Sequence, residues 1–281
     1  MGRGLARNIV DAGHKLLALD SNSAMVDSLF ELGVRKASGL RELAESCEVI
    51  LTCLPSVKSI REVYLAPDGL IGLARKGSVL VDCSTSDPVL SREIAARLSP
   101  RGIDFLDAPM LRNPEAAWNG TLHLIVGGEA SVVERVRSVL DAVAERVVLV
   151  GPVGAGDVLK LINNAVTISN TAILCEVFTV ARAYGVDLTL LTDVLGSSMA
   201  GSKVLPTVSK RLIGNDHSSL FATDVVKKDI TLYTNLAAAG ELMCPLGDTV
   251  RDLMRLTSGA GYGAEHYSRL ATLLESGNPK T

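Results

Sequence analysis

The first half of the chain alternates short apolar runs, rich in β-branched residues, with longer stretches in which apolar residues recur at helical spacing. Strands that alternate with helices predict βαβ units and a mostly parallel sheet, a doubly wound fold whose ligand lies at the carboxyl ends of the strands. Strands are predicted at 15–20, 48–55, 77–84, 103–109, 122–128 and 146–151. Helices are predicted between them at 3–12, 23–33, 40–46, 57–64, 89–98 and 130–143.

The pattern changes after Gly156, where the strand signal stops. Residues 157–184 predict one long helix that ends at Gly185. Further helices are predicted at 188–195, 202–213, 222–240, 245–257 and 264–275. The chain therefore divides into an α/β Rossmann-like doubly wound sheet domain over residues 1–153 and an all-helical domain over residues 154–281, with the border in the glycine-rich sequence GPVGAG.

Composition places the chain among ordinary globular proteins. Its 281 residues are 47% hydrophobic and 21% charged, which suits one large domain or two of average size. The net charge of -3 gives no electrostatic reason to expect nucleic acid or an anionic membrane as a partner. The most apolar window, 158–180, is too polar to span a bilayer, since it contains Lys160, Asn163, Asn164, Asn170 and Glu176.

Cysteine and histidine usage indicates neither a disulfide framework nor a metal site. The five cysteines form no CxxC pair, which predicts scattered reduced thiols in a soluble, cytoplasmic protein. His123 alternates with apolar residues and is expected in the core or at a sheet edge. His217 and His266 lie in polar, loop-like stretches, and no carboxylate at helical spacing beside them suggests a metal ligand.

The start of the chain carries part of a dinucleotide-binding pattern, which needs a strand, the sequence G-x-G-x-x-G and then a helix. Gly2 precedes a helical stretch, and the strand after that helix ends in Asp20, where the ribose diol of NAD would be held. Gly2 therefore fits the third glycine. The first strand and the first two glycines would precede residue 1, because of a start assigned too late or a real truncation. Alternatively, Gly2 is an ordinary glycine and Asp20 a turn residue.

A second glycine-rich segment imitates this pattern. Residues 146–160 also read as a strand, a glycine-rich turn and a helix. Their glycines are spaced G-x-x-G-x-G, and no second strand with a terminal acid follows. This segment is therefore not the predicted dinucleotide loop.

The sequence GAGDVLKLINN (154–164) is the most specific feature of the chain. Lys160 and Asn164 stand four residues apart and share one helix face, and both are costly to bury without partners. One interpretation is a lysine whose ammonium reaches solvent and an asparagine that caps a neighbour. However, the helix starts directly after the sheet domain, so its first turns face the strand ends where nicotinamide would lie. Hydride transfer from an alcohol needs a base for the hydroxyl proton, and a partly desolvated lysine suits that role.

Several segments in this order resemble the β-hydroxyacid dehydrogenase family, which includes 3-hydroxyisobutyrate dehydrogenase, tartronate semialdehyde reductase and glyoxylate/succinic semialdehyde reductase. The resemblance runs from Gly2 to about Leu274 and implies a helical domain of the 6-phosphogluconate dehydrogenase C-terminal type. It is carried by MGRGLARNIVDAGH (1–14), LPSVKSIREVY (54–64), VDCSTSDP (81–88), DAPMLRNPEAAWNGTL (107–122), GAGDVLKLINN (154–164) and FATDVVKKDITL (221–232).

The resemblance implies a role for each matched residue. Lys160 would exchange a proton with the substrate hydroxyl, and Asn164 would orient that hydroxyl. Asp20 would favour NAD as the cofactor, because relatives that prefer NADP carry an arginine just after this strand, where this chain has Ser21. Thr85 would lie near nicotinamide or substrate. The remaining implied contacts are Gly2, Leu54, Pro55 and Lys228 to the cofactor, and Phe221 and Asp229 to the substrate from the helical domain.

The resemblance also separates branches and implies an assembly. Related 6-phosphogluconate dehydrogenases carry Lys-x-x-His-Asn, whereas this chain has Asn163 before Asn164. Imine reductases usually lack the lysine, so Lys160 argues against them as well. Members of the family form dimers or tetramers largely through their helical domains, which implies a homodimer or homotetramer here.

The substrate loop departs from the family. The usual sequence is D-A-P-V-S-G-G, whose serine and glycines hold the substrate carboxylate, whereas here these positions are Leu111, Arg112 and Asn113. We expect Arg112 to bind the acid group of the substrate with two parallel hydrogen bonds, and Asn113 to lie beside it. Such a loop suits a more acidic head group, such as a sulfonate or a second carboxylate. The alternative is an Arg112 that points to solvent.

Three functions remain open. The first is an oxidoreductase that transfers a hydride between NAD and a small 3-hydroxy acid, 3-hydroxyisobutyrate-like, or its semialdehyde, with Lys160 as general acid/base. The second is an NADPH-dependent reductase of small semialdehydes or sulfolactaldehyde-like acids, which Asp20 disfavours and Arg112 permits. The third is a catalytically silent dinucleotide-fold scaffold, which the absent first strand favours and the set Lys160, Asn164 and Lys228-Asp229 disfavours.

Overall fold

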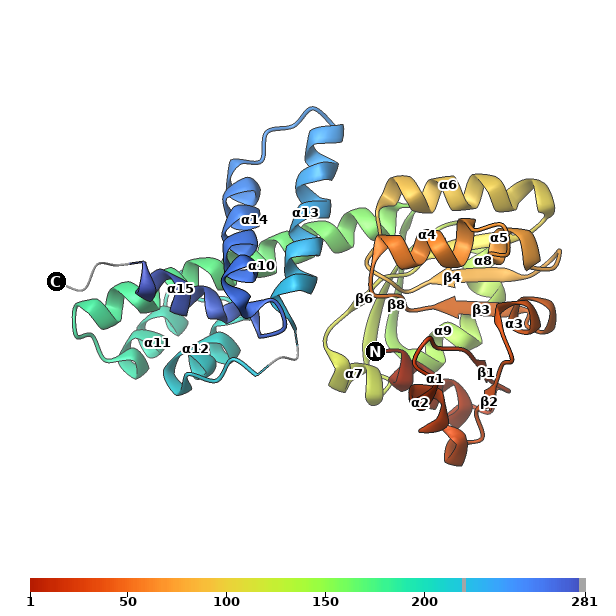
Figure 1. The fold of residues 1–281 in the computed structure, drawn as a ribbon, viewed down its shortest axis with the longest axis horizontal. Helices are drawn as coiled ribbons and strands as arrows, with labels where there is room; N and C mark the ends of the chain where they lie inside the picture. Colours follow the sequence, from red (N-terminus) through yellow and green to blue (C-terminus); the bar gives the residue numbers. More distant parts are fainter. Residues whose placement is uncertain (219–220, 278–281) are drawn as a thin grey trace. The chain divides into compact units, whose positions relative to one another are not determined.

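The computed structural model describes residues 1–218 and 221–277. The chain forms two compact units, Met1–Lys160 and Leu161–Thr281. The first is a Rossmann-like sheet domain and the second is helical, as the sequence predicts (Figure 1). The border between the units falls inside a long helix, after the border at residue 153 that the sequence indicates.

The main sheet of the first unit is mixed in direction. Strands β3 (Val49–Thr52), β4 (Val79–Asp82) and β5 (Asp104–Asp107) are parallel neighbours. β7 (Leu122–Gly127) pairs antiparallel with β5 and with β6 (Met110–Leu111), which continues the register of β5, and it pairs in parallel with β8 (Ala144–Gly151). The sheet is therefore less parallel than predicted. The reason is local: only the short α7 (Pro114–Trp118) separates β6 from β7, which is too little chain for a parallel crossover.

A separate two-stranded sheet precedes the main one. β1 (Leu17–Ala18) pairs in parallel with β2 (Arg35–Lys36), and among the described residues no pairing joins them to the main sheet. The strand predicted at 15–20 is thus reduced to its central pair, and β2 was not predicted because two exposed basic residues carry no apolar signal. The expectation of a strand before residue 1 stays a prediction.

The sheet is covered on both faces by helices. Along β4, Val79 and Val81 pack into one apolar cluster while Leu80 packs into another, since successive strand residues point to opposite faces. The covering helices are α1 (Gly2–Asp11), α3 (Leu40–Ser46), α4 (Val57–Leu65), α5 (Leu70–Leu73), α6 (Pro88–Leu98), α8 (Ala130–Arg135) and α9 (Arg137–Val143), and the short α2 (Ser23–Asp27) follows β1. The single helix predicted at 130–143 is two helices because the buried Val136 has a non-helical backbone, with φ -109°.

The second unit packs around α10 (Ala155–Ala183), which ends before the left-handed Gly185 as predicted. Phe178 of α10 is fully buried in the core of this unit. The other helices are α11 (Leu188–Gly196), α12 (Leu205–Gly214), α13 (Thr223–Ala239), α14 (Pro245–Thr257) and α15 (Leu270–Ser276). Among the described residues, α10 alone is long and apolar enough to cross a membrane, but half of its most apolar window is buried, as in a core helix.

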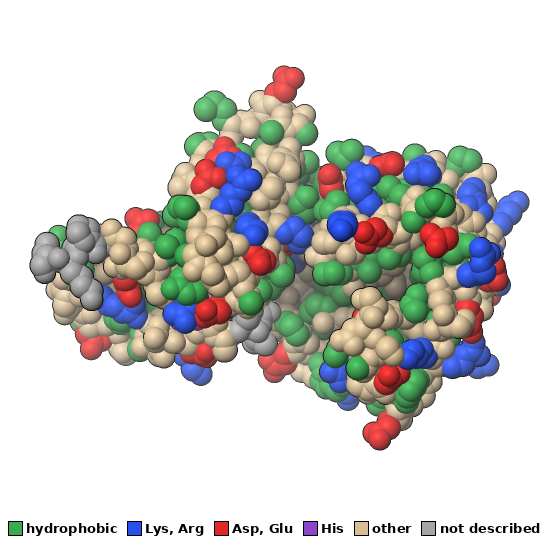
Figure 2. Space-filling model, in the orientation of Figure 1, with side chains coloured by type: hydrophobic (Ala, Val, Ile, Leu, Met, Phe, Trp, Pro, Cys, Tyr) green, Lys and Arg blue, Asp and Glu red, His purple; other side chains and the backbone are tan. Residues whose placement is uncertain are grey.

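Charges are mixed over the surface. On the face shown in Figure 2, basic and acidic side chains are interspersed over both units, in keeping with the net charge of -3. This face carries no basic stripe of the kind that binds nucleic acid.

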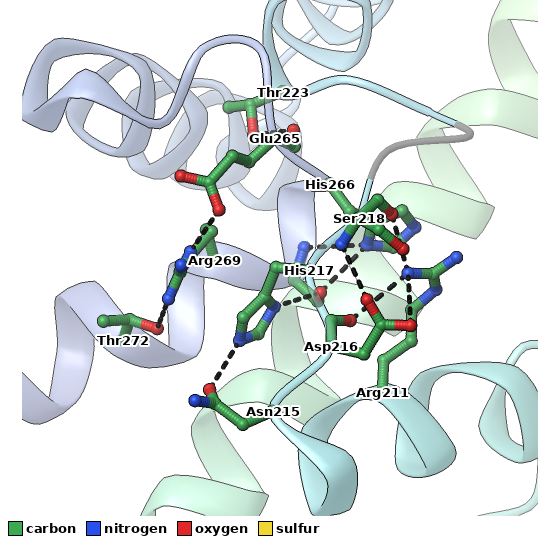
Figure 3. A network of polar contacts seen from close by, with 11 residues as sticks. Arg211, Asn215, Asp216, His217, Ser218, Thr223, Glu265, His266, Arg269 and Thr272 are labelled. Atoms are coloured by element: carbon green, nitrogen blue, oxygen red, sulfur yellow. Dashed lines mark hydrogen bonds and ion pairs between the residues drawn. The ribbon is translucent and has the colours of Figure 1, made fainter.

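His217 and His266 lie in loops, as predicted, but they are buried rather than solvated. Both imidazoles contact one hydroxyl: Ser268 Oγ lies 2.8 Å from His217 Nδ1 and 2.9 Å from His266 Nδ1. The backbone N–H of His266 also donates to the carbonyl of His217 at 3.0 Å. This network joins the segment after α12 to the segment before α15, with Arg211 and Arg269 close by (Figure 3).

These histidines make the stability of the helical unit depend on pH. Burial, aided by the charge of Arg211, lowers the pKa of His266 to about 4, and burial also lowers the pKa of His217. In the unfolded chain a histidine titrates near its ordinary pKa of about 6.5. Between about pH 6.5 and 4 the unfolded state therefore binds protons that the folded state rejects, so the free energy of unfolding falls as pH falls.

We predict a smaller acid effect when one of these histidines cannot titrate. In urea denaturation at about pH 7 and about pH 5, the native chain should lose more free energy of unfolding on acidification than the His266→Gln variant. The quantity compared is the change in the free energy of unfolding between the two pH values in each chain. A general loss of stability in the variant therefore does not affect the comparison. Equal changes in both chains would contradict the prediction.

Candidate active site

Gly2 and Asp20 are the residues predicted to hold a dinucleotide. They lie at opposite ends of the segment that comprises α1 and β1. Gly2 begins α1, which has no side-chain cap at its N-terminus. Asp20 follows β1, is exposed, and accepts a hydrogen bond from the backbone N–H of Asn22 at 2.8 Å. Asp20 is therefore a turn residue, which is the alternative that the sequence offered. Its carboxylate stays exposed beside Ser21, which is also exposed. The cofactor roles of these residues stay predictions.

A nearby glycine has a packing role that the sequence did not reveal. A Cβ atom at Gly4 would lie 2.4 Å from the carbonyl oxygen of Ala117, so only glycine lets α1 pack this closely on α7. Asn8 completes the contact by donating its amide to the carbonyl of Ala117 at 2.7 Å. A Cβ at Gly2 would meet only Cys53, at the ordinary distance of 3.9 Å. Within the protein itself, space requires a glycine at residue 4 and not at residue 2.

The loops after β3 and β4, which carry the predicted contacts Leu54, Pro55 and Thr85, are joined by a buried carboxylate. Leu54 N–H donates to Ser84 Oγ at 2.8 Å, and Ser84 Oγ donates to Asp82 Oδ1 at 2.5 Å. Thr52 donates to the same oxygen at 2.9 Å. Burial raises the pKa of Asp82 although these hydroxyls stabilise its charge. Leu54 and Thr85 remain partly accessible and Pro55 is exposed, so this edge of the sheet can contact a ligand.

Lys160 lies in the second turn of α10 and is buried, with 8% of its surface exposed. Its Nζ donates a hydrogen bond to the backbone carbonyl of Met110 at 2.7 Å. The interpretation of a lysine that reaches solvent is therefore wrong. Gly156 permits the close approach of α10 to the sheet, because a Cβ there would lie 2.4 Å from the carbonyl oxygen of Ile125.

The helix that carries Lys160 is anchored by Asp107 at the end of β5. This fully buried carboxylate accepts hydrogen bonds from Gly154 N–H at 2.7 Å and from Asp157 N–H at 2.9 Å. Asp157 in turn accepts a hydrogen bond from Ser91 Oγ at 2.5 Å. Neither Asp107 nor Asp82 was recognised as a site residue from the sequence. The available signal was that each acid lies near the end of a predicted strand, where ligands of a doubly wound sheet bind.

Arg112 makes contacts that the sequence did not indicate. Its guanidinium forms an ion pair with Glu145 at 2.6 Å and donates to the carbonyl of Thr121 at 2.7 Å. His123 lies at 2.9 Å from the same Glu145 oxygen, and it is partly buried on a strand that is paired on both sides, so of the two predicted positions the sheet edge is wrong. Hydrogen bonding from His123 and the Arg112 charge lower the pKa of Glu145.

These contacts fix Arg112 in a strained loop. Its backbone is left-handed, with φ 80°, a conformation that favours glycine. The side chain is 40% exposed, and the contacts to Glu145 and Thr121 use two of the five N–H donors of a guanidinium. Contact with a substrate acid group stays a prediction. Asn113 caps α7, since its Oδ1 accepts the backbone N–H of Ala116 at 2.9 Å.

The helical unit brings together three of its predicted site residues. Asn164 Nδ2 donates to Asp229 Oδ2 at 2.7 Å, and Lys228 Nζ lies 3.0 Å from Asp229 Oδ1 in an ion pair that lacks hydrogen-bond geometry. Asp229 and Asn164 are buried, whereas Phe221 is exposed on one side and packs edge-on against Tyr267 at 6.1 Å. Asn164 is thus held by a carboxylate from α13, one turn along α10 from Lys160.

Comparison with known families covers both units. Residues 1–151 match the family described as the NAD binding domain of 6-phosphogluconate dehydrogenase. Residues 154–274 match the family described as the NAD-binding domain of NADP-dependent 3-hydroxyisobutyrate dehydrogenase. Residues 152 and 153 lie between the two matches.

Individual relatives match over nearly their whole length. The chain is 30% identical to an NAD-dependent L-serine dehydrogenase of Pseudomonas aeruginosa over 285 residues, covering 98% of this chain and 95% of the relative. It is 28% identical to a 3-sulfolactaldehyde reductase of Escherichia coli, covering 96% and 91%. The crystal structure of a 3-hydroxyisobutyrate dehydrogenase from Salmonella typhimurium superposes with a TM-score of 0.87 at 27% identity, covering 97% and 95%.

Proposed function

Because the chain belongs to the β-hydroxyacid dehydrogenase family, whose members oxidise CH–OH groups, we propose that it transfers a hydride between NAD and a small 3-hydroxy acid or its semialdehyde. The observation that carries this proposal is the buried ammonium of Lys160, held by the carbonyl of Met110 in the second turn of α10. Such a group is costly to bury, and a lysine is able to exchange a proton with a substrate hydroxyl.

Lys160 moves the proton of the reaction. In the oxidation, the hydride leaves the carbinol carbon and the hydroxyl proton passes to the neutral amine of Lys160, so that a carbonyl forms. In the reduction, the ammonium of Lys160 returns the proton to the carbonyl oxygen. Asn164 orients that oxygen through its amide, which Asp229 holds at 2.7 Å.

NAD supplies the hydride acceptor, and the residues at the start of the chain fit it. The uncapped N-terminus of α1 at Gly2 has the donors and the dipole end that suit a pyrophosphate. The exposed carboxylate of Asp20 suits the ribose diol and repels the additional phosphate of NADP. Ser21 brings no compensating cation, and this is the reason that we propose NAD over NADP.

A second candidate is an NADPH-dependent reductase of small semialdehydes or sulfolactaldehyde-like acids. Arg112 favours it, because a guanidinium replaces the glycine that relatives carry in the substrate loop. The similarity to a 3-sulfolactaldehyde reductase supports an acidic head group in this candidate. Asp20 counts against its cofactor.

We further propose that the enzyme is a homodimer or homotetramer. Val166, Ile173 and Val180 stand seven residues apart on α10 and are 58%, 53% and 50% exposed. An apolar stripe with this period along one helix is typical of a helix–helix interface between subunits.

The proposed compartment is the cytoplasm. All five cysteines are free thiols, as expected of a protein kept in a reducing environment.

The proposed chemistry predicts that turnover depends on Lys160. Lys160→Ala should lower kcat by roughly 10²- to 10⁴-fold, because the proton has no carrier, while NADH binds as in the native chain. Lys210→Ala, which removes an exposed lysine of α12, should leave kcat unchanged. Steady-state kinetics with a panel of 3-hydroxy acids and NAD provide the measurement. A Lys160→Ala variant as active as the native chain would rule out this mechanism.

The proposed role of Arg112 predicts opposite effects of two neighbouring substitutions. Arg112→Ala should raise KM for an acidic substrate about tenfold or more with little change in kcat, since uniform binding is lost. Glu145→Gln should lower that KM, because it removes the anion that now neutralises the guanidinium. An unchanged KM in both variants would show that Arg112 does not contact the substrate.

The proposed interface predicts a change of assembly. Ile173→Glu should dissociate the oligomer in analytical ultracentrifugation, because a charge would be buried between subunits. Ile213→Glu, which changes an isoleucine of α12 that is 45% exposed, should leave the assembly intact. A native chain that sediments as a monomer would contradict the proposal.

A further inference from the structure

Asp107 has a role in this fold that none of the residue predictions gave it. It ends β5 and is fully buried, yet both of its oxygens are occupied by backbone donors from a distant segment. Oδ1 accepts from Gly154 N–H, in the turn before α10, and Oδ2 accepts from Asp157 N–H, in the first turn of that helix. The amides of a helix N-terminus lack partners within the helix, so the carboxylate acts as their cap from across the sheet.

The carboxylate has no freedom to move. A Cβ atom at Gly127 would lie 2.5 Å from Asp107 Oδ1, and a Cβ at Gly156 would lie 2.8 Å from Oδ2. The two glycines thus bring backbone against both oxygens, and a longer acid has no room there. The sheet therefore fixes the position of the carboxylate, and the carboxylate in turn fixes the position of the start of α10.

Asp107 and Asp157 form a buried pair of acids. Burial raises the pKa of Asp107, while the N–H groups of Gly154 and Asp157 favour its charged form. Burial and the charge of Asp107 raise the pKa of Asp157 well above its ordinary value, and the side chain of Asp157 accepts a hydrogen bond from Ser91. The two backbone donors at the start of α10 thus meet the carboxylate of Asp107.

A second link closes the arrangement. Three residues after Asp107, the carbonyl of Met110 accepts the hydrogen bond from Lys160 Nζ. Lys160 lies about one helical turn after Asp157. Two sets of hydrogen bonds consequently join the segments 107–110 and 154–160. Asp107 binds the start of the helix, and Lys160 binds Met110 one turn later.

We propose that Asp107 is a positioning residue, which sets the place of the Lys160 ammonium by anchoring the first turn of α10. This inference rests on the proposed function, in which Lys160 exchanges the proton with the substrate. Asp107 acts through the helix and not on the substrate. Its removal should therefore reduce the rate of proton transfer without weakening the binding of cofactor.

The test compares Asp107→Asn with Ser91→Ala. The amide of Asp107→Asn keeps the size of the side chain but turns a donor toward one of the two backbone N–H groups, so one anchor bond is lost. Ser91→Ala removes a buried hydrogen bond to the same helical turn and leaves the anchor intact. We expect Asp107→Asn to lower kcat about 10- to 100-fold, with the Kd for NADH and the KM for the hydroxy acid within about twofold of the native values. Ser91→Ala should retain the native kcat.

A second readout does not depend on turnover. Hydrogen exchange of the amides at 154–157, followed by mass spectrometry, should accelerate in Asp107→Asn and report the loss of the anchor. A native kcat in Asp107→Asn overturns the inference, whether or not exchange accelerates. An equal loss of kcat in Ser91→Ala overturns it as well, because any loosening of this turn would then suffice. A native chain without dehydrogenase activity refutes the proposed function and the positioning role with it, while exchange still tells whether the anchor exists.

Discussion

The hydrogen bonds from the first amides of α10 to Asp107 are the constraint on which the rest of the site depends. A buried carboxylate is tolerated only when its oxygens are satisfied, and here the satisfying groups are the otherwise unpartnered donors of a helix start. The same hydrogen bonds thus satisfy both the buried carboxylate and the amides of the helix start. They join Asp107, the last residue of β5, to the helix that carries Lys160. At the end of the neighbouring β4, Thr52 and Ser84 donate hydrogen bonds to Oδ1 of Asp82, and these bonds fix the loops beside it.

Glycine makes this arrangement sterically possible. The motif around Gly154 and Gly156 resembles a dinucleotide-binding loop, but the spacing of its glycines predicts that it is not one. In the structure the motif serves close packing, because Gly156 lies against the carbonyl of Ile125 and against the Asp107 carboxylate. Its glycines therefore place the helix that carries Lys160 on the sheet. A similar packing role falls to Gly4, where α1 meets α7.

The sequence predicts the strands and helices that are long and regularly patterned, and it misses what depends on tertiary pairing. The runs that became β3, β4, β5, β7 and β8 were recognisable because each contains successive apolar residues. The two-residue strands β2 and β6 carry too little pattern, and the antiparallel pairing of β7 with β5 follows from the path of the chain between them. The Arg112–Glu145 contact depends on β6, β7 and β8 being neighbours, which no local spacing reveals. The burial of His217 and His266 was not predicted for a related reason, since their shared partner, Ser268, is distant from His217 in the sequence.

The central claim is that this chain binds a nicotinamide dinucleotide and prefers NAD. Titration of the purified protein with NADH and, in parallel, with NADPH, followed by nicotinamide fluorescence, tests it most directly. The account predicts saturable binding of NADH with a Kd on the order of micromolar, and clearly weaker binding of NADPH, because Asp20 repels the additional phosphate. Tighter binding of NADPH would favour the reductase of acidic semialdehydes. Binding of neither nucleotide would contradict the account.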